Sequence, residues 1–181
     1  MKNCIPCPFI RYYAVIISLI CSSYISAQTL HTESFDNATF PPAGWQQGGG
    51  NTGYVNQVTA GNNPAQSPHS GAGEVEFNSY NLTSGTTLLI SPVIDWSNLG
   101  TDSAAISFWF YRDGTSYLDS GFANEGVQLL VNTSPTDAGA VQLGFVSRVD
   151  TFSPAVNSTG WYQYTYYVPT SFNTSSNYFI L

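Results

Sequence analysis

The sequence predicts an all-β domain, an antiparallel β-sandwich of the jelly-roll type. Short runs that alternate apolar and polar residues recur along the chain, and this period of two is typical of strands with one buried face. Clusters of Gly, Asn, Pro and Ser separate these runs, as turns between strands do. Few stretches show the 3.6-residue period of a helix, so a helical or α/β fold is not expected.

Residues 1–27 have the composition of a signal peptide. Positive charges come first, an apolar run follows, and small polar residues lead to a cleavage point after Ala27. The apolar run from Tyr12 to Ile20 is far shorter than the roughly 20 residues of a bilayer-spanning helix, so a membrane anchor is the weaker alternative. We expect an exported protein, secreted or held at the cell surface, with one domain over residues 28–181 and no direct membrane insertion.

Cysteine positions and charge exclude several classes of site. All three cysteines (Cys4, Cys7 and Cys21) lie in the leader, so residues 28–181 have no disulfide, thiolate metal site or cysteine nucleophile. Outside the leader only Arg112 and Arg148 are basic, against 11 acidic residues. Such a surface repels phosphate backbones, which excludes nucleic-acid binding. Sparse arginines among many acids are expected to form intramolecular ion pairs.

The first strand is predicted within Glu33–Trp45, where a short alternation runs into a Pro-Pro turn and a tryptophan. The polar stretch Gly48–Gly73 is predicted to be a long loop, and residues 113–124 a second one. Further strands are expected over residues 74–80, 87–94 (interrupted at Ser91-Pro92), 106–111, 127–132, 141–149, 161–168 and 178–181.

Alternation also assigns residues to faces. Val75 and Phe77 share one face of their strand, and Glu74 and Glu76 share the other, which is predicted to be solvated. In the strand over 106–111, one face carries Ile106, Phe108 and Phe110. The opposite face carries Ser107, Trp109 and Tyr111.

The last predicted strand, residues 178–181, stops without a turn, a cap or a polar tail. As an end strand it would leave its edge and its side chains unpaired. We therefore expect the sandwich to be truncated before its last strand or strands.

Several motifs follow one another in a defined order across residues 28–181. They are residues 33–36 (ESFD), 40–45 (FPPAGW), 89–95 (LISPVID), 106–114 (ISFWFYRDG), 127–135 (VQLLVNTSP), 143–144 (LG) and 160–164 (GWYQY). In order and spacing the set resembles the choice-of-anchor J domains of bacterial secreted proteins. These domains are related to the cleaved-adhesin domains of gingipains and, more distantly, to MAM domains.

The resemblance implies a jelly-roll sandwich, an extracellular location and a role in adhesion or substrate binding within a larger multidomain protein. The family pattern continues past residues 178–180 into a Tyr-Gly-Asn type turn and a final acidic strand. This chain lacks both.

The resemblance also implies a calcium site, in which acids from the first and last strands meet around the ion. Asp36 stands in the matching first-strand position, and Glu33 is close to it in sequence. Carboxylate oxygens suit this hard cation, but the partner acids would lie beyond Leu181. The alternative is that Asp36 caps the turn at Asn37.

Trp109 and Tyr111 form a second candidate ligand-binding site, an aromatic platform for a sugar, with Trp161 and Tyr167 as further members. Aromatic rings present flat, partly apolar faces to which sugars can bind. The alternative is that long loops cover this face, in which case the rings are structural.

No residue is predicted to be catalytic. His31 and His69 are the only histidines, and His69 lies between Ser67 and Ser70 without a G-x-S-x-G or H-E-x-x-H motif. The acids at 74 and 76 alternate with apolar residues, as on a solvated sheet face, rather than forming a glycosidase pair.

The predicted function is therefore that of a non-catalytic adhesion or recognition domain, whose partner is a host or matrix protein or a glycan. One alternative is a carbohydrate-binding module attached to a secreted hydrolase. Another is the accessory domain of a secreted peptidase.

Overall fold

The computed structural model describes residues 31–79, 82, 84–114 and 125–181. The predicted signal peptide and most of the predicted loop 113–124 lie outside these residues. Within them the chain is all-β with antiparallel strand pairs and short 3₁₀ turns, which confirms the predicted sandwich class. No helix in these ranges has the length and apolar character that a bilayer crossing requires.

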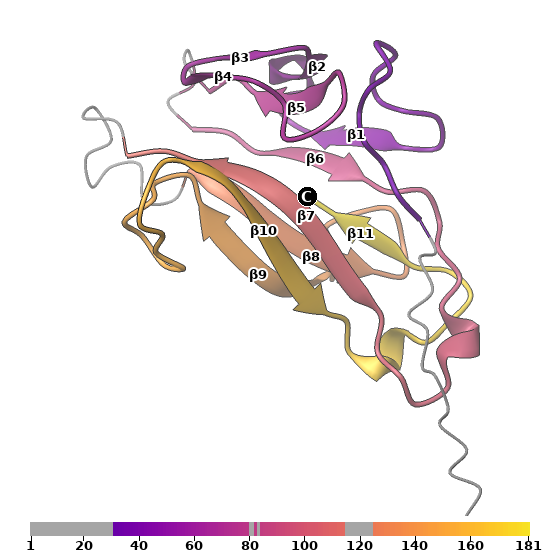
Figure 1. Cartoon of the computed structure of the whole chain (residues 1–181). Helices are drawn as coiled ribbons and strands as arrows, with labels where there is room; N and C mark the ends of the chain where they lie inside the picture. Colours follow the sequence, from indigo (N-terminus) through magenta and orange to yellow (C-terminus); the bar gives the residue numbers. More distant parts are fainter. Residues whose placement is uncertain (1–30, 80–81, 83, 115–124) are drawn as a thin grey trace, which may run out of the picture.

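Two layers form the sandwich (Figure 1). One layer is a five-stranded sheet in the order β1-β6-β11-β8-β9. Its strands are β1 (Gln46–Gly49), β6 (Thr87–Ile90), β11 (Tyr178–Ile180), β8 (Gly126–Asn132) and β9 (Val141–Ser147). The opposite layer contains β7 (Ala105–Arg112) and β10 (Gly160–Tyr167), which pair with each other along their whole length.

The main core lies between these layers. Leu129 and Val131 of β8 are fully buried, and Ile106 of β7 packs in the same cluster together with Val168, which follows β10. Phe108 packs against this cluster, whereas the side chain of Trp109 is 43% exposed. The predicted division of β7 into an inward and an outward face is therefore confirmed.

β11 was expected to leave an unpaired edge, and this expectation is wrong. Ile180 pairs with Ile90 of β6 on one side and with Leu130 of β8 on the other, and its side chain is fully buried. Leu181 extends the pairing by exchanging two backbone hydrogen bonds with Leu89. β11 is thus the central strand of its sheet, which alternation alone does not reveal.

Residues 48–73 were predicted to form a loop, but they contain short strands. They are β2 (Val55–Val58), β3 (Gly61–Asn62) and β4 (Ala65–Gln66), preceded by the 3₁₀ turn η1 (Thr52–Tyr54). β2 pairs with β5 (Glu74–Phe77), and β3 pairs with β4. We call residues 55–77 the β2–β5 unit.

The β2–β5 unit lies on the core side of the five-stranded sheet. The Gln47 side chain of β1 donates a hydrogen bond to the Val55 carbonyl at 3.0 Å. Trp45, two residues before Gln47 and so on the same face, meets the ring of Phe179 edge-on at 5.4 Å, and Phe179 packs against the main core. The unit therefore shares a side of this sheet with β7 and β10 (Figure 1).

The segment predicted to hold the first strand, Glu33–Trp45, contains no regular strand, and β1 begins directly after it. Phe35 adopts a positive φ of 58°, which breaks an extended conformation. The aromatic rings in this segment instead hold it to the sandwich. Trp45 is buried and packs against Phe35 at 5.5 Å as well as against Phe179.

The predicted faces of β5 are not observed: Val75 and Glu76 are both half-buried, and the two ends of the strand depart from the prediction. Glu74 is only 6% exposed, whereas Phe77 is 37% exposed. The β3–β4 hairpin covers the acidic face, because the Gln66 side chain donates to Glu74 at 2.6 Å and the Asn62 backbone N–H donates to Glu76 at 3.4 Å. A covering hairpin within a presumed loop could not be seen in the alternation.

The two arginines differ in their partners. Arg148 forms the predicted ion pairs, with Asp113 at 3.2 Å and with Glu125 at 3.3 Å. Arg112 is fully buried and instead donates to the carbonyls of Val149, Phe152 and Pro154 and to the Tyr164 hydroxyl. The ion-pair prediction is confirmed for Arg148 but not for Arg112, because one loop supplies the acceptors of Arg112.

Candidate ligand-binding cleft

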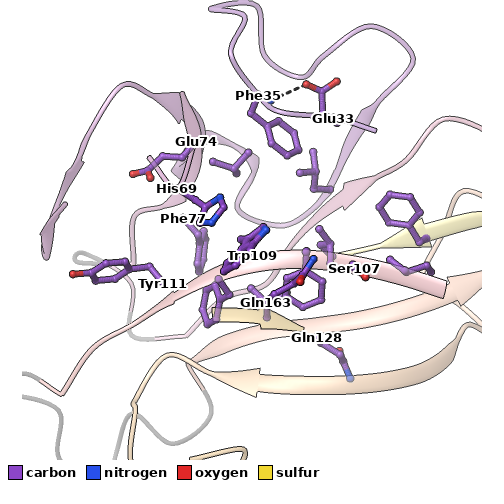
Figure 2. A pocket seen from close by; sticks show the side chains of 18 of the residues that line it. Glu33, Phe35, His69, Glu74, Phe77, Ser107, Trp109, Tyr111, Gln128 and Gln163 are labelled. Carbon is purple, nitrogen blue, oxygen red and sulfur yellow. Dashed lines mark hydrogen bonds between the residues drawn. The ribbon is translucent and has the colours of Figure 1, made fainter. Parts of the chain in front are cut away.

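A cleft of about 1520 Å³ lies between β5 and β7 (Figure 2). All four residues of β5 line it, as do the consecutive residues 105–111 of β7. Leu89, Phe179 and Leu181 also line it, so the core face of the five-stranded sheet forms its floor. Because β5 and β7 are not paired with each other, the layer opposite that sheet is divided by the cleft.

A short loop, residues 67–70, reaches from β4 to the outward face of β7 and β10; we call it the strap. The His69 ring stacks on Trp109 with centroids 3.7 Å apart and planes inclined by 18°. It also meets the ring of Trp161 edge-on at 6.0 Å. The indole N–H of Trp161 donates to the Ser67 carbonyl at 3.0 Å. One hydrogen bond and two ring contacts therefore attach the strap to this face.

The structure brings together most of the predicted aromatic platform. Tyr111 and Trp161 meet edge-on at 5.4 Å, and Trp109 lies on the same outward face of the β7–β10 pair. Tyr167, 73% exposed, lies at the far end of β10 and does not line the cleft. His69 covers one face of Trp109, so the ring offers a ligand its edge and the surface that remains exposed.

His69 is the residue of this cluster that the sequence did not assign to it. Its place in Ser67-Pro68-His69-Ser70 gave no signal for a ring contact, because the contact depends on the β3–β4 hairpin that directs the strap. His31 also packs on an indole, that of Trp45, at 5.8 Å. The two histidines thus lie against different tryptophans.

Glu74 is an unusual carboxyl group beside the cleft. Burial raises its pKa above the ordinary value of 4.5, Gln66 partly opposes this with its hydrogen bond, and the nearby Glu76 charge adds to it. One of its oxygens, Oε2, has no hydrogen-bond partner among the residues that the structure describes. The site therefore favours a proton on Glu74 more than water does.

A polar network closes one end of the cleft. Arg148 joins Glu125 and Asp113 and also donates to the Asn63 carbonyl in the β3–β4 turn at 3.4 Å. The Ser79 hydroxyl donates to the same carboxylate of Glu125. This network connects the end of β9, the start of β8 and the β2–β5 unit.

The predicted calcium ligands are occupied by backbone amides. Asp36 Oδ1 accepts from Ala72 N–H at 2.6 Å and from Gly73 N–H at 3.3 Å, so it anchors the turn at 71–73 and not the turn at Asn37. The Ala72 amide, the Ser34 side chain and the Gly73 amide together lower its pKa, although some burial opposes them.

Glu33 Oε1 accepts from Phe35 N–H at 2.8 Å. Within the described ranges no cluster of three His, Cys, Asp or Glu side chains lies close enough to hold a metal. Calcium takes six to eight oxygen ligands. The donor set described here does not fit calcium without further ligands.

Comparisons with known proteins agree with the fold. No family model matches the chain, and no curated protein matches its sequence. The solved structure of the K1 cleaved adhesin domain of Lys-gingipain from Porphyromonas gingivalis W83 matches with a TM-score of 0.51 and 20% identity, over 82% of this chain and 84% of that one. The K3 cleaved adhesin domain of the same protein matches with a TM-score of 0.48 and 20% identity, over 77% and 79%. The chain thus has a β-sandwich fold similar to that of a cleaved adhesin domain.

Proposed function

We propose that this chain is a non-catalytic adhesion or recognition domain of a larger secreted or surface-held bacterial protein, related to choice-of-anchor J domains. Its partner is a host or matrix protein or a glycan. The observation that supports this most directly is the half-exposed Trp109 at the rim of a long cleft, supported by Tyr111, Trp161 and His69. Aromatic side chains that are held rigidly and partly exposed are typical anchors of recognition surfaces.

The experiment is a binding screen of residues 28–181 against immobilised matrix proteins and a glycan array. We expect at least one class of partner to bind, and Trp109→Ala to weaken that binding at least tenfold. Tyr167→Ala is the matched control, because Tyr167 is more exposed but lies away from the cleft. Binding that withstands Trp109→Ala in a protein with unchanged circular dichroism would contradict the proposal, as would an empty screen.

Carbohydrate binding is the second candidate, and the exposed indole of Trp109 favours it. A sugar ring would stack on the surface of Trp109 that His69 leaves free, beside Tyr111. In the same screen, glycan binding that a soluble oligosaccharide inhibits distinguishes this function from recognition of a protein. Glycan-independent binding to a matrix protein would exclude it for that partner.

Calcium binding at Asp36 and Glu33 stays a separate proposal, resting on the family resemblance. Its test is the melting temperature of a protein extended beyond Leu181 through the expected last strand, with 2 mM calcium and in chelator. This concentration is near the roughly 10⁻⁴ to 10⁻³ M dissociation constants of extracellular modules. A shift that Asp36→Asn abolishes would support the site. An unchanged melting temperature would contradict it.

A further inference from the structure

The outer edge of β10 carries backbone groups that have no strand partner. β10 pairs only with β7 among the described strands, and it lies on the side of the sandwich where β9 ends the opposite sheet (Figure 1). The cleft lies on the far side of β7, so a strand that enters the cleft leaves the outer edge of β10 unchanged. The edge of β10 is therefore independent of what fills the cleft.

The ladder shows which groups of β10 point away from β7. Val168 N–H donates to the Ala104 carbonyl at 2.8 Å, and these two residues continue the β7–β10 register. Hydrogen-bonded pairs alternate in an antiparallel ladder, so the even-numbered residues of β10 bond to β7. The N–H and C=O groups of residues 161, 163, 165 and 167 point to the outer side. Among the described residues, no backbone hydrogen bond reaches them there.

Away from the cleft, β10 lacks the features that protect the other outer edges. β1 and β2 are only four residues long. β9 is longer, but its pairing with β8 has a register shift between Leu129 and Leu130. β10 has eight residues in unbroken register with β7 and contains neither proline nor a charged side chain. Short strands, bulges, prolines and charges block added strands, so β10 is the most open of these edges.

The charge distribution limits the kind of strand that fits this edge. Residues 28–181 carry 11 acidic residues against Arg112 and Arg148, so two copies of the chain repel each other wherever acids face acids. β10, with the sequence GWYQYTYY, brings no such charge to its edge. A strongly charged segment finds no opposite charge on this strand, whereas β10 of a second copy meets it without repulsion.

The sequence of β10 is complementary to itself about Tyr164. With a two-fold axis at this residue, Trp161 lies opposite Tyr167 of the second copy, and Gln163 lies opposite Thr165. All the residues with outward backbone groups are then paired, whereas an axis at Gln163 or Thr165 leaves one of them without a match in the strand. Aromatic rings opposite each other stabilise an antiparallel pair, and an amide can donate to a hydroxyl.

Two side-chain observations support this arrangement. Tyr167, 73% exposed, is the most exposed large apolar residue among those described, and Trp161 of a second copy would cover it. On the inward side, the Tyr164 hydroxyl accepts from the buried Arg112 at 2.7 Å, and the ring of Tyr166 stacks on Phe108 at 6.3 Å. These contacts hold β10 to the core, so its edge is already extended and fixed before a partner arrives.

We propose that the chain forms a symmetric dimer in which β10 of one copy pairs antiparallel with β10 of the other, with the two-fold axis at Tyr164. The two layers then join into one continuous layer in the order β7-β10-β10-β7. A two-fold dimer is the commonest protein oligomer. Because the axis is perpendicular to the layer, both copies present Trp109 on the same side. This inference goes beyond the proposed recognition function and does not depend on it.

The test uses the protein extended beyond Leu181 through the expected last strand and lacking residues 1–27. In sedimentation velocity over a hundredfold range of protein concentration, we expect a dimer whose share rises with concentration. Amide hydrogen exchange is then compared at the two ends of this range. In the dimer the amides of 161, 163, 165 and 167 should exchange at least tenfold more slowly. Those of 162, 164 and 166, already bonded to β7, should exchange slowly in both samples.

A proline variant removes part of the edge. Thr165→Pro deletes one outward amide without touching the bonds to β7, and its ring obstructs a second strand. It should raise the dissociation constant of the dimer at least tenfold. Thr165→Ala, which keeps the amide, is the matched control. Both variants lose the 2.7 Å hydrogen bond between the hydroxyls of Thr165 and Ser107, so this loss cancels in the comparison.

A pair of charges tests the register. Gln163→Glu adds an acid to the edge of each copy and should weaken the dimer. Adding Thr165→Lys places a lysine opposite each new acid across the axis and should restore the dimer. Gln163→Glu with Ser107→Lys has the same net charge but no lysine on β10, so it should not restore it. Failure of Thr165→Lys to restore the dimer would overturn the axis at Tyr164.

Three results overturn the inference as a whole: a monomer at every concentration, a dimer whose protected amides lie outside β10, or a dimer that Thr165→Pro leaves unchanged. If the proline variant does not fold, the exchange pattern of the unaltered protein decides. The matrix-protein and glycan screen is run at the low end of the concentration range, so its outcome does not depend on the dimer.

Discussion

The two halves of the sandwich are held together by different interactions. In the closed half, β7 and β10 cover β8 and β9, and fully buried apolar side chains such as Leu129 and Val131 fill the space between the layers. In the open half, polar contacts hold the β2–β5 unit in place. Gln47 of β1 donates to the Val55 carbonyl, and Asp36 accepts from the turn at 71–73. Within the unit, Gln66 donates to Glu74.

This difference predicts that the two halves contribute unequally to stability. Burial of large apolar side chains contributes about 1.5–3 kcal/mol each, whereas a typical hydrogen bond contributes about 0.5–1.5 kcal/mol. The closed half should therefore contribute more to the stability of the fold than the open half. The cleft lies along the boundary between the two halves. Substitutions on its two sides should differ accordingly.

The largest effect is expected at Arg112, at one end of the closed half. Arg112→Met leaves the carbonyls of Val149, Phe152 and Pro154 without their buried donor. We expect the free energy of unfolding to fall by about 3–5 kcal/mol, measured by urea denaturation. A loss below about 1 kcal/mol would show that water takes the place of the guanidinium, and that the space around these carbonyls is open to solvent.

A matched pair of truncations compares the halves directly. Leu129→Ala in the closed half should cost about 3 kcal/mol, because Leu129 is fully buried and its removal leaves a cavity. Phe77→Ala in the open half should cost less than about 1 kcal/mol, since this side chain is already 37% exposed. Equal losses in urea denaturation would contradict the division into halves.

The strap gives a smaller effect. Trp161→Phe removes the hydrogen bond to the Ser67 carbonyl but keeps an aromatic ring beside Tyr111. We expect a loss of about 1 kcal/mol and faster proteolytic cleavage within residues 67–70. Tyr167→Phe, on the same strand but away from the strap, serves as the control and should change neither. Unchanged cleavage in Trp161→Phe would mean that the stack of His69 on Trp109 holds the strap alone.

The smallest effect depends on pH and on Glu74. Because burial raises its pKa, the folded protein binds this proton more tightly than the unfolded chain does. The free energy of unfolding should therefore fall as pH rises from the ordinary value of 4.5 through the raised pKa.

Glu74→Gln removes this dependence. At pH 7 its free energy of unfolding should exceed that of the unaltered protein by less than about 1 kcal/mol, so its melting temperature should be slightly higher. At pH 4 the two proteins should have the same melting temperature. If the melting temperatures of Glu74→Gln and of the unaltered protein change with pH in the same way, Glu74 titrates in the folded protein as it does in the unfolded chain.

The sequence predicted the closed half better than the open half. Alternation in residues 106–111 assigned Phe108 and Trp109 to the correct faces, because this strand has one side against a continuous core. In the open half the same rule failed at Glu74 and Phe77. There the burial depends on a hairpin with strands of only two residues each and on an unfilled cleft, and neither leaves a periodic signal in the sequence.

The candidate site was predicted in part. Trp109, Tyr111 and Trp161 follow from their places on strands, but their stacking partner His69 comes from a loop whose path no local pattern indicates. Asp36 was singled out as a calcium ligand, and the structure shows it bound to the Ala72 and Gly73 amides 36 and 37 residues further along the chain. Contacts of that range depend on topology and not on spacing.

Arg112 has a consequence for the conformation of the loop at 149–154. Its guanidinium donates to three carbonyls of one loop, those of Val149, Phe152 and Pro154, and backbone carbonyls are also among the ligands of bound calcium ions. The guanidinium is covalently part of β7, so dilution or a chelator cannot remove it. The loop at 149–154 should therefore keep its conformation in calcium-poor surroundings, whether or not Asp36 binds calcium.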